Sequence, residues 1–157
     1  MDKEYRACYV SPIGPLEIKG TDKGVESLHF VEKKFKSDSS IPAHMKDCLF
    51  QLDEYFKGKR KTFKVKLQLQ GTEFQKKVWK QLMQIPYAKT LSYKEVAQAI
   101  GNEKAVRAVG GANGRNHVGI IIPCHRVIAH DGTLGGFGGG LWRKEWLLNH
   151  EKKIAKP

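Results

Sequence analysis

Cysteine is scarce in this sequence, and long apolar runs are missing altogether. The 157 residues include only Cys8, Cys48 and Cys124, an odd number without a CxxC pair, which argues against a disulfide framework and against a four-cysteine zinc site. No stretch approaches 18 apolar residues, and the charged N-terminus has no apolar segment behind it. We therefore expect neither secretion nor membrane insertion. We expect the reducing cytoplasm, or the nucleus of a eukaryote, where a thiol stays free to react.

The sequence also lacks repeats, low-complexity segments and a phosphate-binding loop. Its glycine-rich stretch, residues 135–140, has neither a Gly-Lys-Ser/Thr ending nor a flanking strand–helix unit. We expect this loop to let the backbone approach a flat ligand closely. Cys8, Cys48, His29 and His44 are zinc ligands by type, but their spacing matches no zinc motif. We therefore expect neither a metal nor a cofactor.

Positive charge is in excess, and the excess is unevenly distributed. The sequence has 28 Lys and Arg against 16 Asp and Glu, a net charge of +12. Residues 1–68 carry 14 basic and 10 acidic side chains, a net of +4, whereas residues 69–157 carry 14 and 6, a net of +8. Polyanions are the natural partners of such a surface, nucleic acid first among them. Solubility alone is the alternative explanation.

The patterns of residues 1–70 predict a small antiparallel sheet with a helix. Strand-like stretches separated by turn signals cover residues 5–10, 15–19 and 25–31. Beyond Pro42, which fits the first turn of a helix, apolar side chains recur at helical spacing up to Gly58. Residues 63–69 alternate between apolar and polar side chains, as in a half-buried strand that leads into a second lobe.

Residues 71–157 instead predict a mainly helical lobe. Thr72 can cap a first helix, and Pro86 follows its apolar stripe as a stop. A final helix is expected at about residues 142–151, with Leu141 and Leu147 among its packed side chains. The expected fold class is therefore α/β in the α+β sense, a sheet-and-helix lobe followed by a helical lobe.

Two short helices in this second lobe are spaced as in a helix-turn-helix. Ser92 and Glu95 match a capping box, and Gly101 ends the helix that follows them. Asn102 can cap the next helix, predicted at residues 103–110. The tight glycine-containing turn between the two helices is typical of the motif.

The second helix of this pair carries mostly small or β-branched side chains. Lys104 and Arg107 are the exceptions. Arg107 would stand out from a smooth surface that can approach either another helix or a nucleic-acid groove. An arginine in such a place can enter a base stack or contact a phosphate.

The richest chemistry lies in the tetrapeptide Pro-Cys-His-Arg at residues 123–126. It follows three isoleucines, residues 120–122, which predict a buried strand. A basic neighbour favours the nucleophilic thiolate, although a structural cysteine with a surface His-Arg pair is the alternative. His125 is the candidate base, acting through a turn or a bridging water, and with a carboxylate it would raise the thiolate fraction of Cys124. The candidate carboxylates are Glu151, Asp131 and Glu145.

These features occur together with several others in one order along the chain. The shared segments are Ser92-Tyr93, RAVGGA at residues 107–112, Asn116, IIPCHRV at residues 121–127 and KEWLLNHE at residues 144–151. The combination resembles the O6-alkylguanine-DNA alkyltransferases, DNA-repair proteins that are consumed by their reaction. The resemblance is dense over about residues 71–151 and looser before, where SPIGPL at residues 11–16 looks like the first hairpin of that family. It implies a ribonuclease H-like lobe at residues 1–70 and a DNA-binding and alkyltransferase domain at residues 71–157.

The resemblance implies direct reversal of DNA damage in a single turnover. Cys124 would take the alkyl group irreversibly from O6-alkylguanine, and less readily from O4-alkylthymine, by in-line displacement. His125 would act as a base through a water molecule, with Glu151 orienting it. Tyr93 would help to rotate the nucleotide and donate a proton or hydrogen bond to the departing guanine, and Arg107 would fill the space left in the stack. Rotation is needed because a base inside a duplex hides its O6 from a buried thiol.

Contacts to the DNA and to the flipped base are also implied by the resemblance. The residues implied at the DNA are Arg107, Ser92, Ala108, Arg115 and Arg126. Those implied around the base are Asn116, Val127, Phe137, Gly138 and Gly139, with the carbonyls of Cys124 and Val127 reading the guanine amino group. Phe137 stands where tyrosine is frequent in the family, and Gly138 where some members have serine, which leaves the substrate range open.

Two other functions fit parts of the pattern. A DNA-binding protein that recognises lesions without repairing them would be favoured by a residue other than cysteine at position 124. A thiol hydrolase would leave the basic charge unexplained, and it usually brings its histidine from a distant part of the sequence. The expected partner is double-stranded DNA carrying alkylated guanine, bound by a monomer and without a membrane. Cooperative binding along the DNA is left open.

Overall fold

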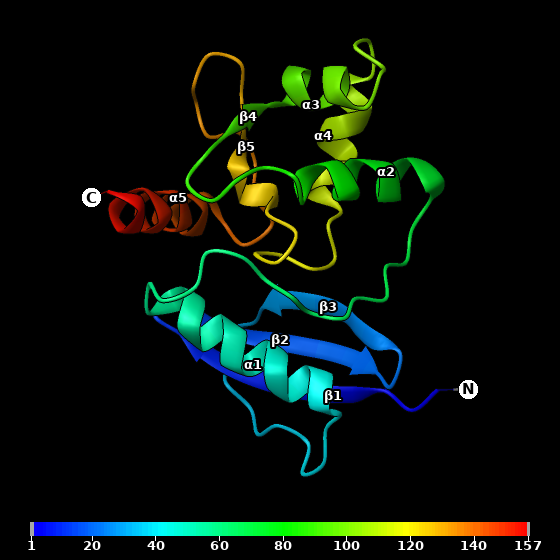
Figure 1. Cartoon of the computed structure of the whole chain (residues 1–157), viewed down its shortest axis with the longest axis vertical. Coiled ribbons are helices and arrows are strands. Elements are labelled where there is room, and N and C mark those ends of the chain that lie inside the picture. The colour runs from blue at the N-terminus through cyan, green and yellow to red at the C-terminus, as the bar shows by residue number, and fades with distance from the viewer. Residues whose placement is uncertain (1, 157) are drawn as a thin grey trace. The chain divides into compact units, whose positions relative to one another are not determined.

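The computed structural model describes residues 2–156, and the chain divides into two compact units, one ending at Gln70 and the other beginning at Gly71 (Figure 1). Each unit has its own set of buried apolar side chains. A sheet with one helix comes first and a mainly helical unit follows, which confirms the predicted α+β (α/β) architecture. Among the described residues, no helix is both long enough and apolar enough to cross a membrane.

The first unit is an antiparallel meander with one helix against it (Figure 1). Its elements are β1 (Tyr5–Ser11), β2 (Gly14–Thr21), β3 (Gly24–Phe30) and α1 (Ala43–Phe56), with the strands in the order β1-β2-β3. Alternate residues of β2, Leu16 and Ile18, are buried, and so are Met45 and Leu52 of α1. The predicted strands and helix are confirmed. Within residues 2–156, no group of three or more His, Cys, Asp or Glu side chains is placed to hold a metal ion.

The strand predicted at residues 63–69 does not form. The segment keeps the predicted alternation of burial, but its one ladder contact is an isolated parallel bridge between Leu67 and Val25. At Lys64, a side chain makes the hydrogen bonds that a neighbouring strand would otherwise make. Gln51 of α1 donates to the Lys64 carbonyl at 2.9 Å and accepts from the Lys64 N–H at 2.8 Å. The backbone of Lys64 is therefore satisfied by a side chain of α1, and Lys66 and Gln68 hydrogen-bond the backbone of Val25 at the isolated bridge.

The second unit is mainly helical (Figure 1). Its elements are α2 (Glu73–Leu82), β4 (Leu91–Ser92), α3 (Tyr93–Ala99), α4 (Val106–Gly114), the 3-10 turn η1 (Cys124–Arg126), β5 (Val127–Ile128) and α5 (Leu141–Ala155). Thr72 and Ser92 each cap a helix in a complete capping box, with Gln75 and Glu95 respectively. These two boxes confirm the predicted starts of α2 and α3. Helices α3 and α4, joined by residues 100–105, pack against each other as in a helix-turn-helix.

Helix α4 begins and ends later than predicted. Its N-cap is Ala105, without a side-chain cap. Asn102 lies instead in the connecting turn, where its carbonyl accepts from the Ala105 N–H at 3.0 Å. Gly101, with φ of +79°, takes the left-handed conformation that ends α3. Gly110 does not take a positive φ, so α4 continues through it to Gly114.

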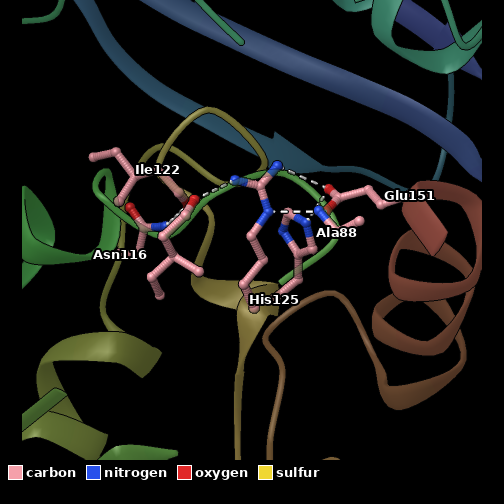
Figure 2. A network of polar contacts seen from close by, with 7 residues as sticks. Ala88, Asn116, Ile122, His125 and Glu151 are labelled. Atoms are coloured by element: carbon pink, nitrogen blue, oxygen red, sulfur yellow. Dashed lines mark hydrogen bonds and ion pairs between the residues drawn. The ribbon is translucent and has the colours of Figure 1, made fainter. Parts of the chain in front are cut away.

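The isoleucines before the reactive tetrapeptide are buried as predicted, but they form a turn and not a strand. Ile120 has a φ of +71°, and the Ile122 N–H donates to the Val118 carbonyl at 3.0 Å. Asn116 holds this turn, because its side chain accepts from the Val118 N–H at 3.0 Å. The same side chain donates to the Ile122 carbonyl at 2.8 Å (Figure 2). Cys124 therefore follows a turn, and the short strand β5, which pairs in parallel with β4, comes after it.

Helix α5 is longer than predicted at both ends. Leu147 is fully buried as expected, but Leu141 is 52% exposed, so its predicted packing is wrong. Leu141 is the first residue of the helix, one turn before the first buried position. The buried side of α5 consists of Lys144, Leu147 and Glu151.

Candidate active site

Cys124 lies in the turn η1, and its side chain is almost completely buried, with 7% of the residue exposed. Two asparagines from the end of α4 and the loop after it contact this residue. Asn116, which also holds the isoleucine turn, hydrogen-bonds the thiol. Asn113 donates from Nδ2 to the Cys124 carbonyl at 3.5 Å. The thiol is thus fixed in the interior of the second unit.

A buried cluster of histidine, arginine and glutamate adjoins the thiol in sequence. His125 Nε2 lies 2.6 Å from Glu151 Oε2. Arg126 donates to both oxygens of the same carboxylate, from Nε at 2.8 Å and from Nη2 at 3.1 Å. The Ala88 N–H adds a further hydrogen bond to Oε1 at 3.1 Å (Figure 2). Glu151 is therefore hydrogen-bonded to the imidazole of His125, the guanidinium of Arg126 and the backbone.

Among the three carboxylates that the sequence offered for His125, Glu151 is the one that the fold brings to the imidazole. Asp131 accepts from Thr133 in an exposed turn. Glu145 is exposed on α5. The helical spacing of α5 explains the selection, because Glu151 lies on the buried side of the helix with Leu147, whereas Glu145 lies on the opposite side.

The imidazole of His125 is neutral in the folded protein. Burial lowers its pKa, and the hydrogen bond and charge of Glu151 do not offset this effect. A carboxylate can only accept, so Nε2 carries the proton and Nδ1 presents a lone pair. Nδ1 is buried and has no hydrogen-bond partner in the described part of the chain. The site therefore holds a proton acceptor next in sequence to the thiol.

Glu151 remains ionised at all ordinary pH values. Burial on its own would raise the pKa of this carboxyl group, but the hydrogen bonds from His125 and Arg126 and the positive charge of Arg126 hold the pKa well below its usual range. The carboxylate can thus orient His125 and neutralise Arg126 at the same time.

We expect the free energy of unfolding to fall in two stages on acidification. The unfolded chain protonates His125 near its ordinary pKa of about 6.5 while the folded state resists, so stability declines below about pH 6.5. The ionised Glu151 stabilises the fold above its unfolded pKa of about 4.5, so this contribution is lost as the pH falls further. Urea unfolding at several pH values between 7 and 3 would measure both stages. A His125→Phe variant should lack the first stage, and a wild-type curve that is flat from pH 7 to pH 5 would contradict the assignment.

The surroundings of Cys124 do not enrich the thiolate, contrary to the expectation from the sequence. Burial raises the pKa of the thiol. The hydrogen bond from Asn116, the charge of Lys144 and the backbone N–H groups of Cys124 and His125 lower the pKa, but they do not cancel the effect of burial. The thiol is therefore protonated at neutral pH, and a nucleophile requires a proton acceptor such as His125 at the moment of reaction.

Lys144 belongs to the site although the sequence patterns assigned it no role. It is fully buried, and its Nζ donates to the Val127 carbonyl at 2.7 Å and to the Gly136 carbonyl at 3.1 Å. Burial lowers its pKa to about 8, and interaction with Cys124 acts in the opposite direction. A signal was available in the sequence, because Lys144 and Glu151 share one helical face with Leu147. Two charged residues on an otherwise buried stripe indicate a site.

The backbone of the glycine-rich loop lies close against Tyr93, in agreement with the close backbone approach expected of this loop. Gly135 has a φ of +71°, and a Cβ at this position would lie 2.9 Å from the Tyr93 hydroxyl oxygen. The backbone of Gly136 hydrogen-bonds Tyr93, while Lys144 binds the carbonyl of the same residue. Of the three residues predicted around the base in this loop, Phe137 and Gly139 are half-buried and Gly138 is exposed. Tyr93 and Lys144 therefore both hold the loop at Gly136.

Helix α4 presents the smooth face that its sequence predicted. Arg107 and Ala108 are exposed. A Cβ at Gly111 or Gly114 would meet nothing within 4 Å, so this side of the helix is open. Arg115, at the end of the helix, is also exposed. These residues are available to a partner, and Arg107 is the long side chain among them.

Two residues predicted at the DNA have buried side chains. Arg126 is only 6% exposed, and besides Glu151 it donates to the Ile85 carbonyl at 2.8 Å. The prediction that its guanidinium contacts DNA is therefore wrong, because an internal carboxylate and a carbonyl already bind it. Ser92 is also buried, and its hydroxyl accepts from the Glu95 N–H in the capping box.

Both units match one protein family. Residues 5–69 match the domain described as 6-O-methylguanine DNA methyltransferase, ribonuclease-like domain, and residues 73–153 match 6-O-methylguanine DNA methyltransferase, DNA binding domain. The fold and these matches define the class, in which a ribonuclease-like domain precedes a DNA-binding domain of 6-O-methylguanine DNA methyltransferases.

Relatives along the whole chain agree with this class. A methylated-DNA–protein-cysteine methyltransferase of Methanosarcina barkeri is 48% identical over 149 residues, which cover 90% of this chain and 93% of the relative. The crystal structure of Mycobacterium tuberculosis O6-methylguanine methyltransferase superposes with a TM-score of 0.88 at 42% identity, covering 98% of this chain and 96% of that one. Mycobacterium tuberculosis OGT in complex with DNA superposes with a TM-score of 0.86 at 44% identity, covering 96% and 94%. This chain belongs to the 6-O-methylguanine DNA methyltransferase family.

Proposed function

We propose that this protein repairs O6-alkylguanine in DNA by moving the alkyl group to the sulfur of Cys124. The sulfur attacks the alkyl carbon, a C–S bond forms, and the C–O bond breaks with its electron pair going to O6 of guanine. The thiol gives up its proton and the departing guanine gains one, so the charges balance. The product is unmodified guanine and a thioether on the protein.

One observation carries this proposal: a buried thiol lies next in sequence to a buried imidazole that a buried carboxylate orients. His125 can accept the thiol proton at Nδ1, through a water molecule, because its Nε2–H is donated to Glu151. The positive charge that develops on the imidazole is then stabilised by the ionised Glu151. Removal of the proton during the reaction suits a thiol whose pKa is raised by burial.

The leaving guanine needs a proton or a hydrogen bond, and we assign this task to Tyr93. Burial raises the pKa of Tyr93, so the hydroxyl keeps its proton at neutral pH and can donate it. The hydroxyl lies against Gly135 in the glycine-rich loop. We assign the surfaces of Phe137, Gly138 and Gly139 to the base, with Asn116 and Lys144 holding the segments on which the thiol and the loop depend.

A buried thiol can reach O6 only if the nucleotide leaves the duplex. We assign this step to α4, whose exposed glycines and Ala108 allow close approach to a groove while Arg107 enters the space left by the base. Arg115 and the excess positive charge of residues 69–157 would bind phosphates. The proposed unit of function is a monomer on double-stranded DNA, in the cytoplasm or a nucleus, with residues 71–157 as the reacting domain and residues 1–70 as a separate lobe.

Intact mass spectrometry after incubation with a duplex carrying O6-methylguanine tests the proposal. The wild-type protein should gain the mass of one methyl group, and Cys124→Ser should gain none. O4-methylthymine in the same duplex should react more slowly. A protein that binds the duplex but never gains mass would contradict alkyl transfer, and repeated hydrolysis of an ester or amide would indicate a thiol hydrolase instead.

The Arg107→Ala variant should lose most of its rate on a duplex, by about tenfold or more, and much less on the free base O6-methylguanine. The reason is that a free base needs no rotation out of a stack. Single-turnover alkylation rates with the two substrates would measure the ratio. Lys104→Ala, a change of another cation near the same helix, should affect both substrates little. Equal losses on duplex and free base for Arg107→Ala would contradict its role in flipping.

A further inference from the structure

The segment that follows α1 in the first unit, residues 57–66, is strongly basic. It contains six cations and no acidic residue, and the cations are Lys57, Lys59, Arg60, Lys61, Lys64 and Lys66. The five lysines are exposed, and the arginine is half-buried. Like charges in so short a stretch repel one another. The proposed reaction uses none of them, so this concentration of charge calls for an explanation.

Two of the six cations are neutralised within the first unit. Lys57 Nζ lies 2.8 Å from Asp53 Oδ2, and both residues belong to the C-terminal end of α1 or directly follow it. Arg60 Nη2 lies 2.9 Å from Glu54 Oε1. Three lysines of the segment make no ion pair with any residue from 2 to 156, and these are Lys59, Lys64 and Lys66. Their charge is available to a partner.

The backbone that carries these lysines is held in place. The Gln51 side chain makes two hydrogen bonds to the backbone of Lys64, at 2.9 and 2.8 Å. The Val25 N–H donates to the Lys66 carbonyl at 2.8 Å. The lysines therefore project from a fixed segment, and an anion that binds them does not have to order the backbone first.

The alternation of burial along this segment sets the spacing of the lysines. Residues 63–67 are half-buried and exposed in turn, which puts Lys64 and Lys66 on the exposed side. Two such positions of an extended chain lie about 7 Å apart. This spacing is comparable to that of successive phosphates in one strand of a nucleic acid. The segment therefore presents positive charges at intervals that suit a phosphate backbone.

The residue type also favours phosphates over a protein partner. Lysine is depleted in protein–protein interfaces, whereas it binds phosphate readily as a point charge. Contacts to phosphates position a protein on DNA without reading its sequence. Because the second unit matches a DNA-binding domain, DNA is the polyanion that this chain meets.

We propose that residues 57–66 form a second surface for DNA phosphates, at which Lys59, Lys64 and Lys66 bind the backbone outside the lesion. The inference goes beyond the proposed function, which gives the contacts to DNA to the second unit alone. Phosphate contacts release counterions from any DNA sequence, so this surface raises the affinity for damaged and undamaged duplexes alike. The first unit thereby adds affinity for DNA, while the second unit carries the reaction.

A full-length triple variant tests this surface, with Lys59→Gln, Lys64→Gln and Lys66→Gln together. Binding to a long undamaged duplex would be measured at several salt concentrations. Each lost phosphate contact reduces the slope of log K against log salt by about 0.9, so the slope should become shallower by about 2–3. The affinity at low salt should fall by about tenfold or more. Alkylation by free O6-methylguanine should stay within about twofold of wild type, because a free base has no phosphates.

A second triple variant is the matched control, with Lys33→Gln, Lys34→Gln and Lys36→Gln. It removes the same charge from another exposed segment of the same unit, and it should change the slope by less than about one. Equal losses in the two variants would overturn the inference, because net charge alone would then explain binding. An unchanged slope in the first variant would overturn it as well, and so would a loss confined to a duplex with O6-methylguanine.

The failure of this inference and the failure of the proposed function give different results. A protein that loses the expected slope in the first variant but is never alkylated by O6-methylguanine would contradict the proposed function and support this surface. A wild-type protein that is alkylated in a duplex, with a salt dependence that the first variant leaves unchanged, would do the reverse.

Discussion

The Glu151→Gln variant is expected to lose about 3–5 kcal/mol of unfolding free energy and to accept the alkyl group at least about tenfold more slowly. The loss of stability follows from the burial of this site, because the amide leaves the Arg126 guanidinium inside the protein without an anion. The loss of rate follows from the imidazole, since an amide cannot stabilise the positive charge that develops on His125. Urea unfolding at pH 7 and single-turnover alkylation would measure the two effects.

Glu145→Gln is the matched control, because it makes the same chemical change at an exposed position of the same helix. It should change stability by less than about 0.5 kcal/mol and leave the rate unchanged. A Glu151→Gln protein as stable and as reactive as this control would contradict the role given to the buried carboxylate. A loss of stability without any loss of rate would leave Glu151 as a structural partner of Arg126 alone.

Lys144→Met is expected to slow alkylation by about tenfold or more while the protein remains folded. Removal of the buried cation raises the pKa of the Cys124 thiol further, since the charge of Lys144 is one of the groups that lower it. It also releases the Val127 and Gly136 carbonyls, which Lys144 connects at the base-binding loop. The rate should therefore fall both with DNA and with the free base.

Stability should respond differently from rate in this variant. Burial has lowered the pKa of Lys144 from 10.5 to about 8, so keeping it charged at neutral pH costs free energy. Methionine removes that cost and the two hydrogen bonds together, and we expect a net change within about 1 kcal/mol. Lys153→Met, at an exposed position of α5, should change neither property. A Lys144→Met protein with the wild-type rate would contradict its place in the site.

Local sequence rules predicted the elements that depend on neighbours in the chain. The capping boxes of Thr72 and Ser92 are complete in themselves, so they located α2 and α3 correctly. The turn signals between the first three strands likewise located the strands of the meander correctly. Helix α4 begins later than predicted because Asn102 lies in the connecting turn, where its backbone carbonyl accepts from Ala105, and Ala105 is the N-cap.

The predicted strands that do not form lie where a side chain, and not a neighbouring strand, hydrogen-bonds the backbone. Gln51 of α1 satisfies the backbone of Lys64, so pairing with β3 is limited to the bridge at Val25. Asn116 similarly holds the isoleucine segment in a turn. In both places the apolar pattern predicted burial correctly, because burial depends on composition. It predicted the wrong backbone, because hydrogen-bond partners depend on the tertiary fold.

The sequence predicted which types of reactive side chain the site contains. It did not predict which of them are buried or which partners they contact. The sequence offered a thiol, an imidazole and several carboxylates, and only the fold brought Glu151 to His125. The resemblance placed Arg126 at the DNA, and its burial was unexpected because charged residues are rarely buried. Lys144 and Asn113 were missed for the same reason, since neither residue type is expected in an interior.

The most direct test of the account is the number of alkyl groups that one protein molecule removes. The protein would be titrated with an excess of a duplex carrying O6-methylguanine, and repaired guanine and methylated Cys124 peptide would be counted together over time. The account predicts that both reach a plateau at one per protein molecule, because nothing in the proposed reaction removes the alkyl group from the thioether. Repair that continues beyond one lesion per molecule, or a methyl group on a residue other than Cys124, would contradict it.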